Sequence, residues 1–500
     1  MTYKSDSEDS QYGNFVNLFA EDDNFAAHLV TAREVQKDLT PSNTSTQISR
    51  WIKECALHKC CPEQLDSPLP TRVIEVATLK ILCTNGAFGK FAALSYCWGT
   101  GSQTQLRSHT FETLTQHLEL SDLPQTIKDA IIVTRSLSIP YLWVDALCII
   151  QDDQEDKLRE IGFMARIYSM AYVTILASSA ADAADGFLQR CPTDRSPSVQ
   201  IPFRISLDQF GSATARIGDF SGHAARQDNP LSQRAWALQE QMMANRLLLY
   251  TPSTLEWRCA AGVMSLDQAL SMDWKYNPMP MLVSQLAESQ EEALEQWLWI
   301  VNDYSRRAMA KKTDKLPAIA ALAETFASVL GEYHAGIWQH GFVQQLAWKI
   351  SEWIRGRRSD VYRAPSWSWA SIDGDVDFGS TDKTCCTLVS VESVPKNEHV
   401  PYGEVAQGAT TLYGRILVGL ISRSEDQYVL LVLSEHFTWT GYLPKSYDRY
   451  KSDGSSAVIS TYAGLILVPA GLNTVRRIGF FEKLPKDEVK DSVDGEITII

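Results

Sequence analysis

Residues 91–101 have the sequence FAALSYCWGTG, and this stretch indicates the fold class. Its first six residues are mostly apolar, which predicts a strand buried on both faces, and the glycines that follow predict where the strand ends. A helical pattern begins at Leu123-Pro124, and a second apolar run follows at 141–145. Helical spacing over 154–168 then leads into a third apolar run at 171–177. Strands alternating with helices over short connections predict an α/β domain with an open, mostly parallel sheet and helices on both faces.

The length of the chain, 500 residues, exceeds what one hydrophobic core usually organises. Local composition then predicts four parts. We expect an acidic, disordered leader at 1–45, an α/β domain at 46–260, a helical section at 261–360 and a β-rich region at 361–500.

The composition is that of a folded protein, with 45% apolar and 21% charged residues. The net charge of -14 provides no basic surface, so we expect neither nucleic acid nor membrane as a partner. The longest apolar stretch, 139–150, contains Asp145 and falls short of the about 20 residues that a bilayer needs. Residues 1–30 have no secretory signal pattern, so we expect a cytoplasmic protein whose ten cysteines are reduced.

Polar and aromatic side chains follow the first two predicted strands. Ser95 and Tyr96 end the first strand, with Trp98 and Gly99 directly after it, and Asp145 ends the second. Ligands of parallel α/β sheets bind outside the carboxyl ends of the strands, so this position favours a binding crevice with an aromatic platform and a carboxylate. The alternative is that the aromatic residues belong to the core or to a domain interface.

A third cluster lies on a segment of helical pattern and contains Arg234, Trp236 and Glu240. Trp236 and Glu240 are four positions apart and share a helix face. A carboxylate shielded by an indole is desolvated, which suits an acid, a base or a group that stabilises a developing cation. The alternative is a structural ion pair between Arg234 and Glu240.

The cysteines suggest two further sites. Cys148 would need a nearby base to act as a nucleophile, and no histidine occurs in the three clusters, so a small buried side chain is the better interpretation. Cys55, His58, Cys60 and Cys61 fall within seven residues. They lack the paired Cys-x-x-Cys spacing of common zinc sites, so a metal site and a reduced thiol cluster both remain open.

Four segments together resemble the fungal heterokaryon incompatibility (HET) domain in order and content. They are LSYCWG at 94–99, LPQTIKDA at 123–130, YLWVDALCIIQD at 141–152 and RAWALQE at 234–240. The resemblance covers about residues 88–260, and APSWSWAS at 364–371 resembles a region often attached to such domains. It implies an effector of fungal nonself recognition that triggers programmed cell death, with a second copy of the chain or the protein of an incompatible allele as its partner.

HET domains have also been viewed as distant relatives of Toll/interleukin receptor (TIR) domains, which have a flavodoxin-like sheet and in some members hydrolyse NAD. This second resemblance implies NAD as a substrate, no firmly bound cofactor and Glu240 as the catalytic carboxylate. The residues that would contact NAD are Ser95, Tyr96, Trp98, Gly99, Asp145 and Trp236. The competing expectation is a signalling module without enzymatic activity, in which the same motifs build the fold and a self-association surface.

Overall fold

The structure is a computed structural model, in which the chain forms two compact units, Met1–Gln285 and Leu286–Ile500. The structure describes residues 15–34, 36–101, 103–189, 198–204, 206, 209–218, 229–252, 254–267, 289–351, 356–379, 383–398, 400–420, 427–439, 458–471, 473–485, 489 and 491–500. Residues 1–14 of the expected leader and 268–288 of the expected helical section lie outside these ranges. Within the described residues, no helix combines the length and the apolar character needed to cross a membrane.

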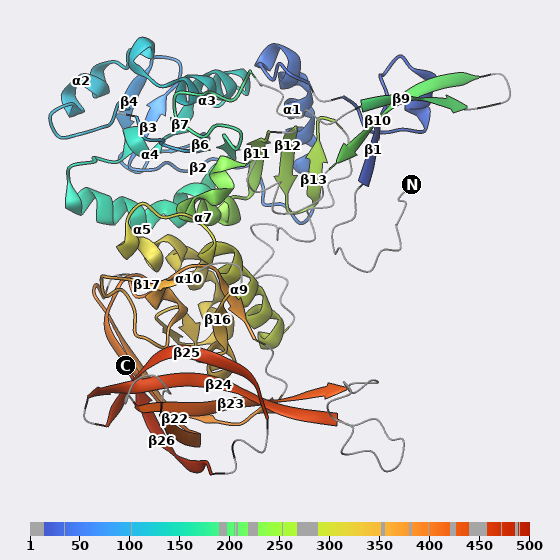
Figure 1. Ribbon diagram of the computed structural model, residues 1–500. Helices are drawn as coiled ribbons and strands as arrows, with labels where there is room; N and C mark the ends of the chain where they lie inside the picture. The colour runs from blue at the N-terminus through green and yellow to red at the C-terminus, as the bar shows by residue number, and fades with distance from the viewer. Residues whose placement is uncertain are drawn as a thin grey trace. The chain divides into compact units, whose positions relative to one another are not determined.

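The first unit is built on an eight-stranded mixed sheet (Figure 1). The strands lie in the order β13 (Gly262–Ser265), β12 (Leu255–Cys259), β11 (Arg246–Tyr250), β8 (Val173–Leu176), β6 (Phe91–Ser95), β7 (Tyr141–Trp143), β3 (Arg72–Glu75) and β4 (Lys80–Cys83).

Only the four middle strands of this sheet, β11, β8, β6 and β7, are parallel. The neighbours on both sides pair antiparallel, so the expectation of a mostly parallel sheet over the whole domain is wrong at its edges. For the hairpin pairs the reason is connection length. Strands joined by short turns, such as β3 and β4 or β12 and β13, can pair only antiparallel, whereas the middle strands are separated by crossover segments.

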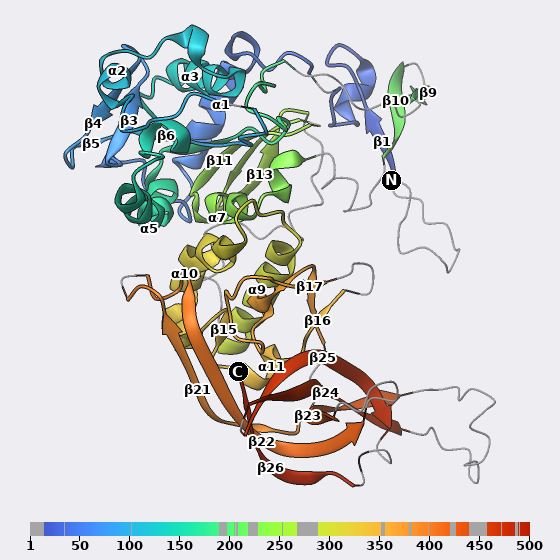
Figure 2. The same ribbon diagram turned by 60° about the vertical axis from the view of Figure 1, so that its left-hand side comes forward.

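Helices cover both faces of the sheet. On one face α1 (Pro41–Cys55) packs with α3 (Gln125–Ser136), and on the other α5 (Gln154–Met170) packs with α7 (Ala235–Met243) (Figures 1 and 2). Because both faces are covered, every residue of β6, β8 and β11 is buried, as expected for central parallel strands.

Local signals account for where these helices begin. The side chain of Asp153, the N-cap of α5, accepts hydrogen bonds from the backbone N–H groups of Glu155 and Asp156, and both of these acids favour the positive end of the helix dipole. Pro124 precedes α3, where the missing N–H costs no helix bond. The sequence therefore predicted both helix starts to within one residue.

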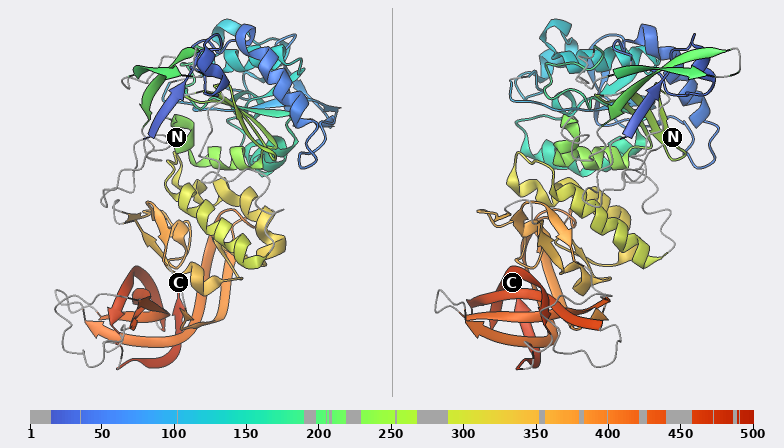
Figure 3. Two further views of the ribbon diagram at one scale, coloured as in Figure 1. Left: turned by 90° about the vertical axis from the view of Figure 1, so that its right-hand side faces the viewer. Right: turned by 45° about the vertical axis from the view of Figure 1, so that its right-hand side comes forward.

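Three strands form a second, smaller sheet in the first unit (Figure 3). The strand β1 (Phe15–Phe19) pairs antiparallel with β10 (Phe210–Gly218), which pairs with β9 (Ser198–Arg204). Part of the expected leader is thus ordered by a strand far downstream. No local pattern in the leader indicates that partner.

The second unit combines helices and a large sheet. Its longer helices are α9 (Gln290–Ser305) and α10 (Ala320–Leu330). The sheet runs in the order β20 (Lys383–Thr384), β23 (Gln427–Trp439), β24 (Val458–Gly471), β25 (Thr474–Pro485), β26 (Val493–Ile499), β22 (Val405–Leu420) and β21 (Thr387–Pro395), and β22 also pairs with β23. The β-rich C-terminal region is confirmed.

The tryptophans of the 364–371 segment lie in the core of the second unit. Trp367 and Trp369 are fully buried. The Trp369 indole donates to the carbonyl oxygen of Gly336 over 2.8 Å, and the Trp348 indole donates to that of Trp367 over 2.7 Å. Buried indoles that find hydrogen-bond partners stabilise a core, so this segment is structural.

Short elements complete the two units. They are α2 (Phe111–Gln116), α4 (Asp145–Cys148), α11 (Phe342–Gln345), β2 (Ser67–Pro68), β5 (Phe88–Gly89), β14 (Tyr333–His334), β15 (Ile337–Trp338), β16 (Trp348–Ile350), β17 (Arg357–Arg358), β18 (Ile372–Asp373), β19 (Val376–Phe378) and the 3₁₀ turns η1 (Phe25–His28), η2 (Leu120–Asp122), η3 (Pro230–Gln233), η5 (Lys312–Lys315), η6 (Pro317–Ile319) and η7 (Trp369–Ser371).

Candidate functional site

The carboxyl ends of β6 and β7 meet at one edge of the sheet and bring two predicted site residues together. The strands are parallel and in register, with Ala93 opposite Trp143. Three residues beyond the end of β6, the Trp98 indole N–H donates to Oδ2 of Asp145 over 2.8 Å. Both residues are half-buried. The second oxygen of Asp145, Oδ1, accepts the backbone N–H of Ala146 over 2.7 Å, so both carboxylate oxygens are hydrogen-bonded.

Glu240 reaches the same edge from α7. Asn229 caps the 3₁₀ turn η3, which leads into α7, and α7 begins after Arg234. The apolar residues on the inner face of α7 are buried, which turns Glu240 toward the sheet. There the Ser95 hydroxyl donates a hydrogen bond to Glu240 Oε2. Ser95 is 1% and Glu240 5% exposed, so this bond is enclosed by protein.

Arg234 is the cation of the site. Its Nη1 donates to the carbonyl oxygen of Tyr96, which follows β6. Burial lowers the pKa of Arg234, and the nearby carboxylates of Glu240 and Asp145 more than offset that effect and raise it. One guanidinium therefore interacts electrostatically with both carboxylates.

Burial controls the protonation of both acids. It raises the pKa of Glu240 to about 7, against lowering effects of Arg234 and of the Ser95 hydroxyl. Burial also raises the pKa of Asp145, opposed by Arg234 and the Trp98 indole. A carboxyl group with a pKa near neutrality can both hold and release a proton under physiological conditions, which is the property expected of a group tuned for chemistry.

Tyr168, on α5, is a further member that the sequence did not assign to the site. Its hydroxyl donates to the carbonyl oxygen of Leu94 over 3.3 Å, and its ring packs edge-on against Trp143 at 5.7 Å between centroids. Burial raises its pKa well above 10, with a smaller contribution from Glu240. Tyr168 therefore stays neutral. In the sequence, the helical spacing of Tyr168 indicated only that it belongs to the core.

The remaining predicted residues surround this centre. The Tyr96 hydroxyl donates to Oε1 of Gln103 over 3.1 Å, and burial raises its pKa well above 10. Trp236 is half-buried on α7 and packs against the main core of the unit.

The structure explains why position 99 is a glycine, which the sequence did not reveal. Its φ of +75° is strained for other residues, and a Cβ at this position would lie 1.7 Å from Oδ2 of Asp182. The same oxygen accepts the backbone N–H of Thr100 over 3.1 Å. The loop after β6 is thus held against the loop after β8. Asp182 thus lies beside Gly99, and the contact of Gly99 with NAD stays a prediction.

Cys148 lies in α4 and is fully buried. Burial raises the pKa of its thiol to about 12, and its sulfur accepts the backbone N–H of Val144 over 3.5 Å. A thiol that stays protonated at neutral pH is a poor nucleophile, which agrees with the interpretation of Cys148 as a small core residue.

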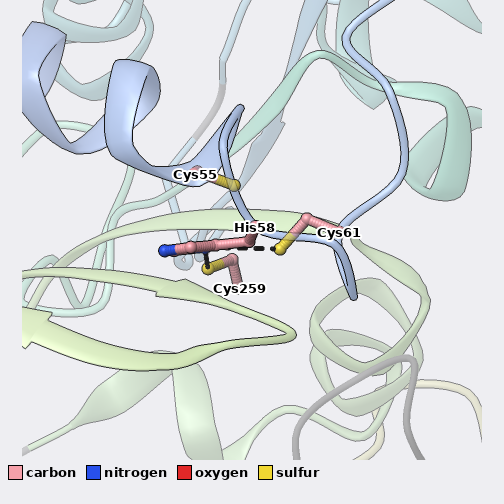
Figure 4. Close-up of side chains that lie close together, drawn as sticks. All are labelled: Cys55, His58, Cys61 and Cys259. Atoms are coloured by element: carbon pink, nitrogen blue, oxygen red, sulfur yellow. Dashed lines mark hydrogen bonds between the residues drawn. The ribbon is translucent and has the colours of Figure 1, made fainter.

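The predicted cysteine and histidine cluster is only partly retained. Cys55, His58 and Cys61 lie together and are joined by Cys259, the last residue of β12 (Figure 4). Cys60 is exposed and is not a member. The sequence could not indicate Cys259, because it is some 200 residues downstream of the other three.

Comparison with known families identifies the part of the chain that holds the Glu240 site. Residues 91–240 match the family model described as "Heterokaryon incompatibility protein (HET)". No curated protein and no solved structure shows detectable similarity to the chain. The matched segment begins with the first residue of β6 and ends at Glu240, so it contains every residue predicted to contact NAD. Residues 91–240 of the chain are therefore similar to the heterokaryon incompatibility (HET) domain.

Proposed function

We propose that this protein is a cytoplasmic effector of fungal nonself recognition whose HET domain triggers cell death by hydrolysing NAD. In this reaction water adds to the ribose carbon C1′, the bond to nicotinamide breaks, and nicotinamide, ADP-ribose and one proton are released. The role in incompatibility follows from the family match at residues 91–240. The residues around Glu240 support NAD hydrolysis as the reaction.

The observation that carries the proposal is the hydrogen bond from Ser95 to Glu240 at the end of β6. Along the chain, β6, β7, β8 and β11 are the first to the fourth of the parallel strands. Within the sheet they lie side by side in the order β7, β6, β8, β11, that is second, first, third, fourth. This is the strand order of flavodoxin-type sheets, in which the ligand binds where the order reverses, between the first and third strands. Ser95 and Glu240 lie at that point.

The chemistry suits one carboxylate of near-neutral pKa. Cleavage of the nicotinamide–ribose bond passes through a state in which positive charge develops on the ribose ring, and a fixed carboxylate stabilises that charge. Ionised Glu240 would do so, or would orient the attacking water. Arg234 and Ser95 both favour its ionised form.

The other members of the site would bind the substrate. The rings of Tyr96, Trp98 or Trp236 would stack on nicotinamide or adenine. Asp145 would accept a ribose hydroxyl after exchanging one of its present donors, Trp98 or the Ala146 amide. Gly99 would act indirectly, by allowing Asp182 to position the loop after β6.

A second candidate function is a signalling module without catalysis. It is favoured by the deep burial of Glu240, whose carboxylate already accepts the Ser95 hydroxyl beside Arg234. In that case the three residues are a structural network, and the protein acts through self-association or through the product of an incompatible allele.

Nicotinamide release from NAD by the purified chain, measured over a range of protein concentrations, distinguishes the two. We expect wild-type activity that rises steeply with concentration if assembly is required, and at least a hundredfold loss in Glu240→Gln. Glu256→Gln is the control, because Glu256 is also buried and paired, with Arg258 on β12. Equal rates in wild type and Glu240→Gln would refute the catalytic assignment. A folded wild type that self-associates but releases no nicotinamide would support the second candidate.

A further inference from the structure

We propose that Cys55, His58, Cys61 and Cys259 form a structural zinc site that ties α1 to the edge hairpin of the main sheet. The ligand atoms of these four residues all lie within 4.8 Å of one another. Three thiolates and one imidazole are a donor set that structural zinc prefers. The inference is independent of any activity at Glu240.

Two successive backbone turns bring the first three ligands, Cys55, His58 and Cys61, together. Cys55 is the last residue of α1, the N–H of His58 donates to the carbonyl oxygen of Cys55, and the N–H of Cys61 donates to that of His58, each over 3.2 Å. Residues spaced three apart along such turns project to the same side. Cys259 completes the set from the end of β12, just before the turn into β13.

The distances between the ligand atoms fit tetrahedral zinc coordination. His58 Nδ1 lies 3.7 Å from the sulfur of Cys61 and 3.5 Å from that of Cys259. In a tetrahedron with ordinary zinc–sulfur and zinc–nitrogen bonds, ligand atoms are about 3.5 to 3.8 Å apart. Figure 4 shows dashed lines from the His58 ring to both of these sulfurs, with the Cys55 sulfur nearby. A disulfide would join two of the sulfurs and would give the imidazole no role.

The surroundings hold the ligands in place. Cys55 and Cys259 are 1% and 2% exposed. Arg246 stands opposite Cys259 in the β11–β12 ladder and donates to the carbonyl oxygen of Pro62, next to Cys61. A zinc ion with three thiolates carries one net negative charge, which this guanidinium would offset.

The kind of ligand atom, sulfur and imidazole nitrogen, indicates which metal would bind. Thiolate and imidazole ligands without a carboxylate or an amide favour zinc over magnesium or calcium, which take oxygen ligands. Four protein ligands leave no open position for substrate, which is the pattern of a structural site. The ion would cross-link residues 201 positions apart, His58 and Cys259, and so fix α1 against β12.

The test is the metal content of the full chain, purified in reducing buffer with zinc and then dialysed. We expect about one zinc per wild-type chain by elemental analysis, and three sulfurs and one nitrogen around it by X-ray absorption. Cys259→Ser and Cys61→Ser should each lose most of the zinc. Cys60→Ser should keep it, because Cys60 adjoins Cys61 but is exposed and outside the cluster.

A second measurement covers the case in which the serine variants fail to fold. Cobalt added to the metal-free wild type should produce the intense visible bands of tetrahedral thiolate coordination, and a mercurial that blocks thiols should release zinc from the untreated protein. Substoichiometric zinc in folded wild type, equal loss in Cys60→Ser, or a disulfide between two cluster cysteines in freshly prepared protein would each overturn the proposal.

Discussion

The Ser95 hydroxyl donates to the Glu240 carboxylate across 145 positions of sequence, and this bond connects the end of β6 to α7. The bond is buried, with Arg234 beside it. A buried hydrogen bond to a charged group contributes more than one at the surface, and its worth depends on whether the acid is ionised. Substitutions in the site are therefore expected to change stability as well as activity.

Ser95→Ala should reduce the free energy of unfolding by about 2 kcal/mol at pH 8, where Glu240 is ionised, and by about half of that at pH 5. It should also raise the pKa of Glu240 further, because the Ser95 hydroxyl lowers it. Urea denaturation at the two pH values measures the first effect. Ser178→Ala is the matched control, since its buried hydroxyl has no hydrogen-bond partner among the described residues and its loss should cost nothing. Equal effects of the two variants would count against the Ser95 bond.

The elevated pKa of Glu240 predicts a specific dependence of stability on pH. Its pKa is about 7 in the folded protein against an ordinary 4.5, so between these values the folded protein holds a proton that the unfolded chain has released. This contribution to stability is complete below pH 4.5 and is lost as the pH rises to 7, with a total of up to about 3 kcal/mol. In Glu240→Gln the loss should vanish.

Unfolding free energies of wild type and Glu240→Gln, compared at half-unit steps from pH 4.5 to 8, test this prediction. The difference between the two proteins should move in favour of the variant as the pH rises, and should level off above 7. Curves that stay parallel would show that Glu240 titrates normally.

Gly99→Ala should destabilise the first unit by about 2 kcal/mol or more. The new methyl group would overlap the Asp182 carboxylate, and the positive φ adds backbone strain. The loop after β6 would then move, so any NAD hydrolysis should fall with it. Gly101→Ala is the control two residues away, where nothing lies within 4 Å of an added Cβ. Thermal unfolding of both variants measures the contrast, and a Gly99→Ala protein as stable as the control would contradict it.

The buried ion pair between Arg72 and Asp156 predicts the largest loss of stability. Arg72 Nη2 lies 2.5 Å from Asp156 Oδ2, its Nε donates to the carbonyl oxygen of Cys148 over 2.7 Å, and Glu160 is 3.8 Å away. Arg72→Met would leave both buried carboxylates with only the partly exposed Arg159 as a cation, at a cost of about 3 kcal/mol.

Arg50→Met is the control for that variant. Arg50 pairs with Glu54 over 2.8 Å on the exposed side of α1, where an ion pair contributes less than about 1 kcal/mol. Urea denaturation at neutral pH measures both substitutions. Similar losses in the two variants would mean that the Arg72 network contributes no more than a surface pair.

Much of the local structure could be predicted from the sequence. The apolar runs predicted β6, β7 and β8, and the helical spacing predicted α3, α5 and α7, because the pattern of apolar residues is a local property of each segment. The carboxyl ends of the first two strands also indicated Trp98 and Asp145 as neighbours, which their hydrogen bond confirms. Strand direction was predictable only for the middle of the sheet, where crossover segments impose it.

The sequence by itself therefore determined the strands β6, β7 and β8, the helices α3, α5 and α7, and the chemical character of the residues at the strand ends. Only the tertiary structure decided which of these residues meet: Ser95 with Glu240, Gly99 with Asp182, and Cys259 with Cys55, His58 and Cys61. The physical reason is that contacts between distant segments depend on strand order and on the packing of whole helices. The periodicity of apolar residues within one segment indicates neither the strand order nor the helix packing.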